Sequence, residues 1–195
     1  MIKILLSLLL ASNCAAADVK EKKPVPPKTK QAVVEGICSF EVPAGWTVDA
    51  DSYSRQTGVS GVKIAAPDAS PEKPAFIYAD YYPADNRISV SSAAYLSQLT
   101  APGTLRPVGR KIGKPQPAKL GALTGSSVQI DSMELYPPEA LSPKKIPVTE
   151  KVVVAGAEKG FFVFSCYAAK GLYSKTSAYF DTVLKTFKQL PQNPK

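Results

Sequence analysis

The stretch GFFVFSCYAAKGLYSKTSAYFDTVLKTFKQL, residues 160–190, decides the fold because it joins a strand to an amphipathic helix. Its first part, FFVFSCYAA, is rich in aromatic and β-branched residues, which favours a buried strand. Apolar residues then recur at the i, i+3, i+4 and i+7 spacing of one helix face: Phe180, Val183, Leu184 and Phe187. This stripe is predicted to face the sheet, and Cys166 lies in the middle of the preceding strand.

Upstream of this stretch, the sequence predicts mostly strands. VVEGICSFEV (33–42) alternates, which predicts one half-buried strand. GVKIAAP (61–67) and AFIYADYYP (75–83) are predicted to form a hairpin, and IPVTEKVVVAG (146–156) forms another with FFVFSCYAA. The segment SSAAYLSQL (91–99), before a Pro-Gly stop, predicts a short helix. Together these elements indicate an α+β fold, in which helices pack on an antiparallel sheet.

The N-terminus has the pattern of a secretory signal peptide. Residues 1–17 carry one lysine and a short apolar run, and Ala15 and Ala17 fit an A-x-A cleavage site. We expect cleavage after Ala17 and a periplasmic or secreted protein. Cys14 leaves a lipoprotein as the alternative, although Asn13 stands where the lipobox usually has Gly, Ala or Ser.

Residues 18–31, DVKEKKPVPPKTKQ, are rich in lysine and proline and are predicted to be a disordered tether. A single domain is expected over 32–190, and 191–195 are expected to be a frayed tail. The net charge is +8. This surplus is either a solvated basic surface or a weak contact with anionic envelope surfaces through the tether. No nucleic-acid reader motif is present in the sequence.

The absence of histidine excludes the commonest general base and the usual serine and cysteine triads. Ser70 to Lys73 and Ser142 to Lys145 match S-x-x-K, but both lie in proline-rich loops and not at a helix start. Asp49 and Asp51 lack the spacing of a calcium loop. We therefore predict no catalytic residue, no metal ligand and no cofactor.

Cys38 and Cys166 are the two cysteines that remain after signal cleavage, and both are predicted to point inward. Neither has a neighbouring base or cation in the sequence that would activate it as a nucleophile. In an oxidising compartment they either pack as small hydrophobic residues or join. A Cys38–Cys166 disulfide is the expectation, provided that the two strands lie beside or opposite each other.

A cluster of tyrosines and charges in IYADYYPADNR is the predicted partner surface, because aromatic side chains contribute contact area at low entropic cost. It comprises Tyr78, Asp80, Tyr81, Tyr82, Asp85 and Arg87. The alternative is that the tyrosines pack on the sheet or under a helix. Trp46 is interpreted as a core anchor.

Several of these segments resemble the PsbP-like family, which includes an extrinsic photosystem II subunit, a Ran-binding import factor and DcrB-like exported bacterial domains. The resemblance rests on FEVPAGW (40–46), the helix SSAAYLSQL, and the terminal hairpin and helix VVVAGAEKGFFVFSCYAA…SAYFDTVLKTFK. It covers most of residues 37–187. The metal sites of photosynthetic members depend on histidine, so no metal residue is carried over and no photosystem role is expected.

The resemblance implies an α/β/α sandwich around an antiparallel sheet that serves as a binding or assembly module, not as a catalyst. We therefore expect an exported, non-catalytic module that acts on a protein partner in the bacterial envelope. A small-molecule or lipid binder with a pocket between helix and sheet is the alternative, and a Ser/Lys hydrolase is the third hypothesis.

Overall fold

The computed structural model describes residues 28–51, 56–89, 91–101 and 109–191. The segment predicted to be a signal peptide and most of the predicted tether lie outside the described residues, as do residues 192–195 of the predicted tail. The elements in chain order are β1 (Thr29–Val34), β2 (Cys38–Pro43), β3 (Thr47–Ala50), β4 (Ser60–Ala65), β5 (Ala75–Pro83), α2 (Ser92–Thr100), β6 (Lys111–Ile112), β7 (Gln116–Leu120), β8 (Leu123–Tyr136), β9 (Lys144–Ala157), β10 (Gly160–Ala169), α3 (Lys170–Thr186) and β11 (Lys188–Gln189).

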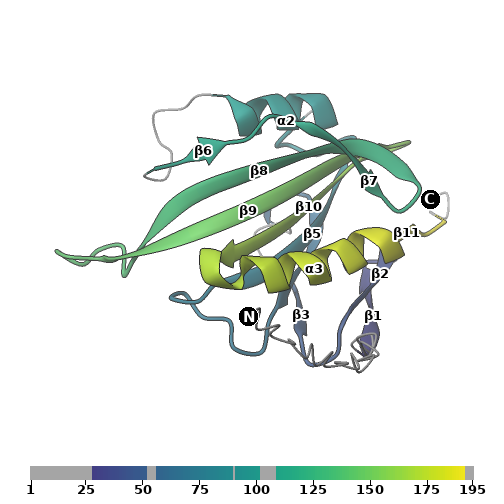
Figure 1. Ribbon diagram of the computed structural model, residues 1–195. Coiled ribbons are helices and arrows are strands. Elements are labelled where there is room, and N and C mark those ends of the chain that lie inside the picture. The colour runs from purple at the N-terminus through teal and green to yellow at the C-terminus, as the bar shows by residue number, and fades with distance from the viewer. Residues whose placement is uncertain (1–27, 52–55, 90, 102–108, 192–195) are drawn as a thin grey trace, which may run out of the picture.

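The strands form two antiparallel sheets. The large sheet has the order β3-β4-β5-β10-β9-β8-β6, with β7 also paired to β8, and the small sheet has the order β1-β2-β11. Figure 1 shows α3 and α2 on opposite sides of the large sheet. The molecule is therefore an α+β sandwich, as the sequence predicted.

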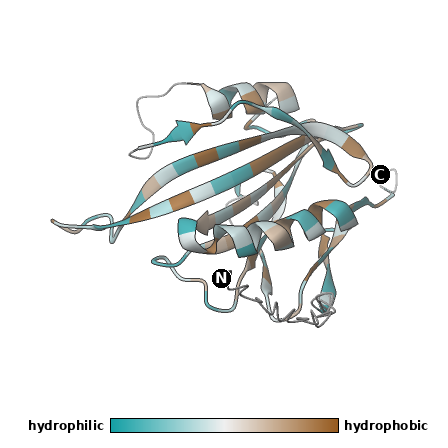
Figure 2. Ribbon diagram, viewed as in Figure 1, coloured by the Kyte–Doolittle hydropathy of each residue, from teal (hydrophilic) through white to brown (hydrophobic). Residues whose placement is uncertain are grey.

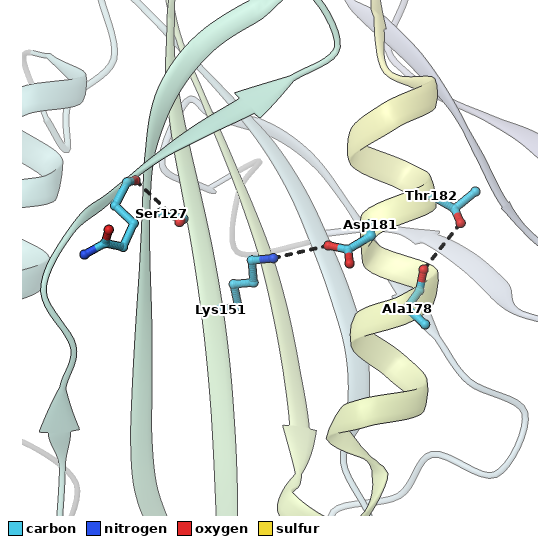
Figure 3. A network of polar contacts seen from close by, with 6 residues as sticks. Ser127, Lys151, Ala178, Asp181 and Thr182 are labelled. Atoms are coloured by element: carbon cyan, nitrogen blue, oxygen red, sulfur yellow. Dashed lines mark hydrogen bonds and ion pairs between the residues drawn. The ribbon is translucent and has the colours of Figure 1, made fainter.

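The face of the large sheet under α3, called the α3 face below, carries the larger core. Its buried residues include Ile77, Ala79, Tyr81, Val153, Phe162, Phe164 and Cys166, which pack with β2 and with the predicted stripe of α3. Phe180 and Val183 are 0% exposed, so the helical stripe read from the sequence is confirmed. An ion pair of 3.2 Å between Lys151 on β9 and Asp181 on α3 lies beside this core (Figure 3).

The opposite face, called the α2 face, carries a smaller cluster. It is formed by Val59, Tyr82, Val128, Ile130, Val152, Val154, Phe161 and Val163, against which Tyr95, Leu96 and Leu99 of α2 pack. Successive strand residues point to opposite faces, so β9 and β10 supply both cores. The near-continuous apolar run of β10 follows from burial on both sides. Figure 2 shows that the hydropathy alternates along β8 and β9.

The first predicted strand is wrong in one respect. Residues 33–42 form two strands, because the chain reverses between Val34 and Cys38. Glu35 and Gly36 both have positive φ, 39° and 73°, which is the backbone that a tight hairpin turn requires. The alternation therefore continued through a turn. β1 also begins at Thr29, three residues before the domain start expected at Ala32.

Candidate functional site

The six residues of the predicted partner surface do not form one surface. Tyr81 is 4% exposed on the α3 face, where its ring lies 4.9 Å from that of Phe162 and its hydroxyl donates to the Lys159 carbonyl oxygen at 2.5 Å. Tyr82 is 7% exposed on the α2 face and stacks on Phe161 at 4.7 Å. The prediction was wrong for these two tyrosines, because adjacent strand residues enter opposite cores.

The other four residues of the prediction lie in two places. Asp85 and Arg87 are exposed in the loop after β5, where they line a shallow hollow of about 390 Å³ with Thr57. Tyr78 and Asp80 are half-buried on β5, opposite Ser165 and Val163 of β10. They therefore share the α2 face with Tyr82, although they lie further along the strand.

Tyr78 lies in a polar part of the α2 face. Burial, together with the nearby carboxylates of Asp51, Glu150 and Asp80, raises the pKa of Tyr78 to about 12. Burial also raises the pKa of Glu150, while the Arg110 guanidinium and a hydrogen bond with Ser165 oppose that rise. The pKa of Tyr167 is raised by burial and by its hydrogen bond to Glu134.

Cys38 and Cys166 are both buried free cysteines. The predicted disulfide between them is therefore not formed. β2 does lie across from β10, since the rings of Phe40 and Phe164 meet edge to face at 5.4 Å. The thiols, however, lie on opposite sides of that contact. Cys38 pairs with β11, which follows the end of α3, whereas Cys166 lies near Tyr173 in the first half of α3.

Burial raises the pKa of both thiols to about 12, and the Lys151 ammonium opposes this only in part at Cys166. The thiolate is the reactive form of cysteine, so both residues are inert at neutral pH. They act as small apolar residues in the core, which was the alternative left open by the sequence.

Neither S-x-x-K match begins a helix. The Lys73 backbone N–H donates to the Ser70 carbonyl oxygen at 3.0 Å and to its Oγ at 3.2 Å, which closes a turn. Ser142 and Lys145 lie at the far end of the β8–β9 hairpin. Among the described residues, no three His, Cys, Asp or Glu side chains come together as metal ligands would.

A groove that the sequence analysis did not predict lies between the first half of α3 and the turn that joins β2 to β3. Its volume is about 360 Å³, within the range of small-ligand sites. It is lined by Lys28, Pro43, Ala44, Trp46, Ala66, Pro67, Asp68, Ala75, Leu172, Lys175, Thr176 and Tyr179. We call it the Trp46 groove.

Local chemistry builds the Trp46 groove. The Pro-Ala-Gly turn places Gly45 at φ 90°, and the Trp46 N–H donates back to the Pro43 carbonyl oxygen at 3.3 Å. The indole then meets Tyr179 edge to face, with 5.4 Å between ring centroids. Trp46 is 6% exposed, so the expectation of a core anchor is confirmed, but it also forms one wall of the groove.

The opposite wall is a second stripe on α3. Leu172, Thr176 and Tyr179 follow the i, i+4, i+7 spacing, and this stripe adjoins the core stripe, since Thr176 is buried together with Phe180. Leu172 is 37% exposed, which is unusual for a large apolar side chain in this chain. The sequence contained this signal, but it could not show that the Trp46 turn lies opposite the stripe.

Comparison with solved structures shows the fold. The chain superposes on cyanobacterial PsbP (CyanoP) from Synechocystis sp. PCC 6803 with a TM-score of 0.51 and 12% identity, covering 83% of this chain and 92% of that one. A protein from Bacteroides thetaiotaomicron VPI-5482 gives a TM-score of 0.52 and 14% identity over 85% of this chain and 50% of that one, so this chain spans half of that protein. The fold is therefore PsbP-like.

A third similar structure is LpqN, involved in cell envelope biogenesis of Mycobacterium tuberculosis, with a TM-score of 0.49 and 17% identity over 86% of this chain and 87% of that one. No protein-family profile and no curated protein sequence matches this chain. None of the helices in the described part of the chain is long and apolar enough to cross a membrane.

Proposed function

We propose that this protein is an exported, non-catalytic binding module that holds a segment of a protein partner in the bacterial envelope. The observation that carries the proposal is the Trp46 groove, an open cleft with an aromatic side chain on each wall, prolines on the Trp46 side and Leu172 on the α3 side. Export rests on the pattern of residues 1–17.

The shape and lining of the groove favour an extended peptide. Trp46 and Tyr179 offer ring edges and faces, and Pro43 and Pro67 extend the apolar lining. Aromatic-lined grooves bind extended, proline-rich peptide segments in several recognition domains. Lys28, Lys175 and Asp68 stand at the groove and can fix the register of a bound segment by charge.

A small apolar molecule or lipid is the second candidate for the same groove. The observation that favours it is the position of the groove between a helix and the sheet, with Thr176 as a buried polar group in the lining. The Thr176 hydroxyl already donates to the Leu172 carbonyl oxygen at 3.0 Å, however, so its hydrogen is engaged within the helix.

Photocrosslinking distinguishes these candidates. A photoreactive amino acid replaces exposed Lys175 at the groove, and a matched one replaces Val33, which is 49% exposed on β1 and outside the groove. We expect a discrete protein adduct from position 175 in envelope extracts and none from position 33. Adding Leu172→Glu to the Lys175 probe should reduce the adduct at least about tenfold, because the apolar contact of the leucine is lost.

A gain in mass of less than a few kilodaltons on the position 175 probe would instead identify a small molecule or lipid. Equal labelling from positions 175 and 33 would contradict both forms of the proposal. Circular dichroism of the Leu172→Glu variant checks the fold, and we expect it to be unchanged because the side chain is partly exposed.

A further inference from the structure

A second hollow, of about 570 Å³, lies where β1, β2, β11 and the last turn of α3 meet. It is lined by Thr29, Lys30, Gln31, Ser39, Phe40, Glu41, Lys185, Thr186 and Lys188. Three exposed lysines from three different elements therefore surround one cavity. We call it the lysine hollow.

Backbone pairing fixes the positions of these lysines. β2 pairs with β1 on one side, where Lys30 lies opposite Val42, and with β11 on the other side, where Lys188 lies opposite Ser39. The Glu41 backbone N–H donates to Thr186 Oγ1 at 2.9 Å, which fastens the end of α3 to the same strand. The strands of the small sheet thus line the hollow. Because paired residues share a face, Lys30 lies on the Val42 face and Lys188 on the Ser39 face, so these two lysines border the hollow from opposite faces of the small sheet.

The hollow is positively charged. Three lysines stand against one carboxylate, Glu41, which accepts a hydrogen bond from Thr29 Oγ1 at 3.0 Å, so the local balance is +2. The ion pairs found among the described residues are Lys144 with Glu72 and Lys151 with Asp181, and neither involves a lysine of the hollow.

The charge continues beyond the hollow on both sides. Exposed Lys119 lines an adjoining hollow with Lys185. The sequence that leads into β1 contributes Lys20, Lys22, Lys23 and Lys28.

We propose that the lysine hollow docks on the phosphate groups of an anionic phospholipid surface. Lysine is a compact, mobile point charge, which suits a fluid layer of headgroups, and each lysine near such a surface strengthens binding. The open shape leaves the site accessible to a surface as well as to a small anion.

The lysine hollow adjoins the Trp46 groove at β1 and β2. Lys28 and Pro43 line the groove, whereas Thr29 and Glu41 line the hollow, and Thr29 pairs with Pro43. On α3 itself, Leu172 lies about 20 Å from Lys185 at 1.5 Å per residue. The inference does not require the proposed peptide-binding function.

Vesicle sedimentation tests the proposal with the full chain and vesicles of phosphatidylglycerol and phosphatidylcholine in a 30:70 ratio at 50 mM salt. The test variant is Lys30→Gln/Lys185→Gln/Lys188→Gln. The matched control is Lys111→Gln/Lys114→Gln/Lys145→Gln, which removes the same charge from exposed lysines elsewhere. Both variants keep the same N-terminal residues, so a difference between them reports the hollow.

We expect the test variant to bind about 100-fold more weakly, at about fivefold per lysine, and the control to lose less than about threefold. Binding should fall steeply at 300 mM salt and be absent on pure phosphatidylcholine. Equal losses in the two variants, or no binding to anionic vesicles, would overturn the proposal. A Lys→Arg version of the test variant should bind within about twofold of the original, and its failure to bind would also overturn it.

Two further arms separate other sources of binding. Inorganic phosphate at 10 mM, added at constant ionic strength, should leave vesicle binding unchanged, and strong displacement would identify a site for free phosphate instead. Leu172→Glu should also leave vesicle binding unchanged, because it lies at the other end of α3. Loss of vesicle binding in that variant would place the membrane contact at the groove and overturn the assignment to the hollow.

Discussion

The two faces of the large sheet are built from the same strands but are covered very differently. On the α3 face, a helix of 17 residues buries Thr176, Phe180, Val183 and Leu184. On the α2 face, a helix of 9 residues has no fully buried residue, and part of the sheet beyond it carries half-buried Tyr78, Glu150 and Tyr167. Strand alternation therefore sets which residues share a face, while the covering helix sets how much each face contributes to stability.

The largest effect should come from exchanging one phenylalanine on each face. Phe164→Ala removes a ring that is 0% exposed and contacts Phe40 and Phe187, so we expect a loss of about 3–5 kcal/mol in the free energy of unfolding. Phe161→Ala should lower the free energy of unfolding by about 3 kcal/mol or less, because the loosely covered α2 face can close over the cavity that the missing ring leaves. Urea unfolding of both variants measures this, and an equal or larger loss for Phe161 would remove the proposed difference between the faces.

Thiol reactivity measures how tightly the α3 face is closed. The pKa of Cys38 and of Cys166 is raised from 9.0 to about 12, which lowers the thiolate fraction about 1,000-fold at pH 8. We expect both thiols to react with a disulfide reagent at least about 1,000-fold more slowly in the folded protein than in urea. Two thiols should be counted in protein that begins at Asp18, after unfolding without reductant. A count of none would restore the disulfide that the sequence suggested.

Capping should affect the α2 face locally. The Ser91 hydroxyl accepts a hydrogen bond from the Ala94 N–H at 3.1 Å, and Ser91→Ala should destabilise α2 by about 1 kcal/mol. Hydrogen exchange should accelerate in α2 and remain unchanged in α3. Ser97→Ala, an exposed change in the same helix, is the control and should leave exchange unchanged. Faster exchange in both helices would show that the faces are coupled.

The smallest effect should be a pH-dependent one at Glu150. Because burial raises the pKa of Glu150 in the folded state, its ionisation costs stability as the pH rises from the ordinary carboxyl range through the raised value. Glu150→Gln should therefore raise the melting temperature at pH 7.5 and have no effect near pH 3, where the carboxyl is protonated in both states. The exposed Glu158→Gln serves as the control. A lower melting temperature at pH 7.5 would show that Arg110 outweighs the burial.

The sequence predicted the elements whose signal is local. The strand over residues 75–83, the helix after Ser91 and the stripe of α3 all follow from spacing and capping, and all are present. The errors concern relations between distant segments. Alternation ran through the Glu35-Gly36 turn, because a period of two does not itself reveal a reversal.

The candidate sites were harder to predict for the same reason. The sequence could place Tyr81 and Tyr82 on opposite faces but could not show that both faces are covered at that point. The Trp46 groove and the lysine hollow each join segments that lie more than 100 residues apart in the chain, and single-sequence patterns do not report such pairings.

The pairing of β11 with β2 has a consequence for the order in which the chain can complete its fold. β2 is made well before β11, and 145 residues separate Glu41 from Thr186, to which it bonds. The small sheet cannot close until the chain has been made as far as Gln189. The lysine hollow, which this closure assembles, therefore exists only once β11 is present, so a chain that stops before β11 would lack the charged surface that we propose meets the membrane.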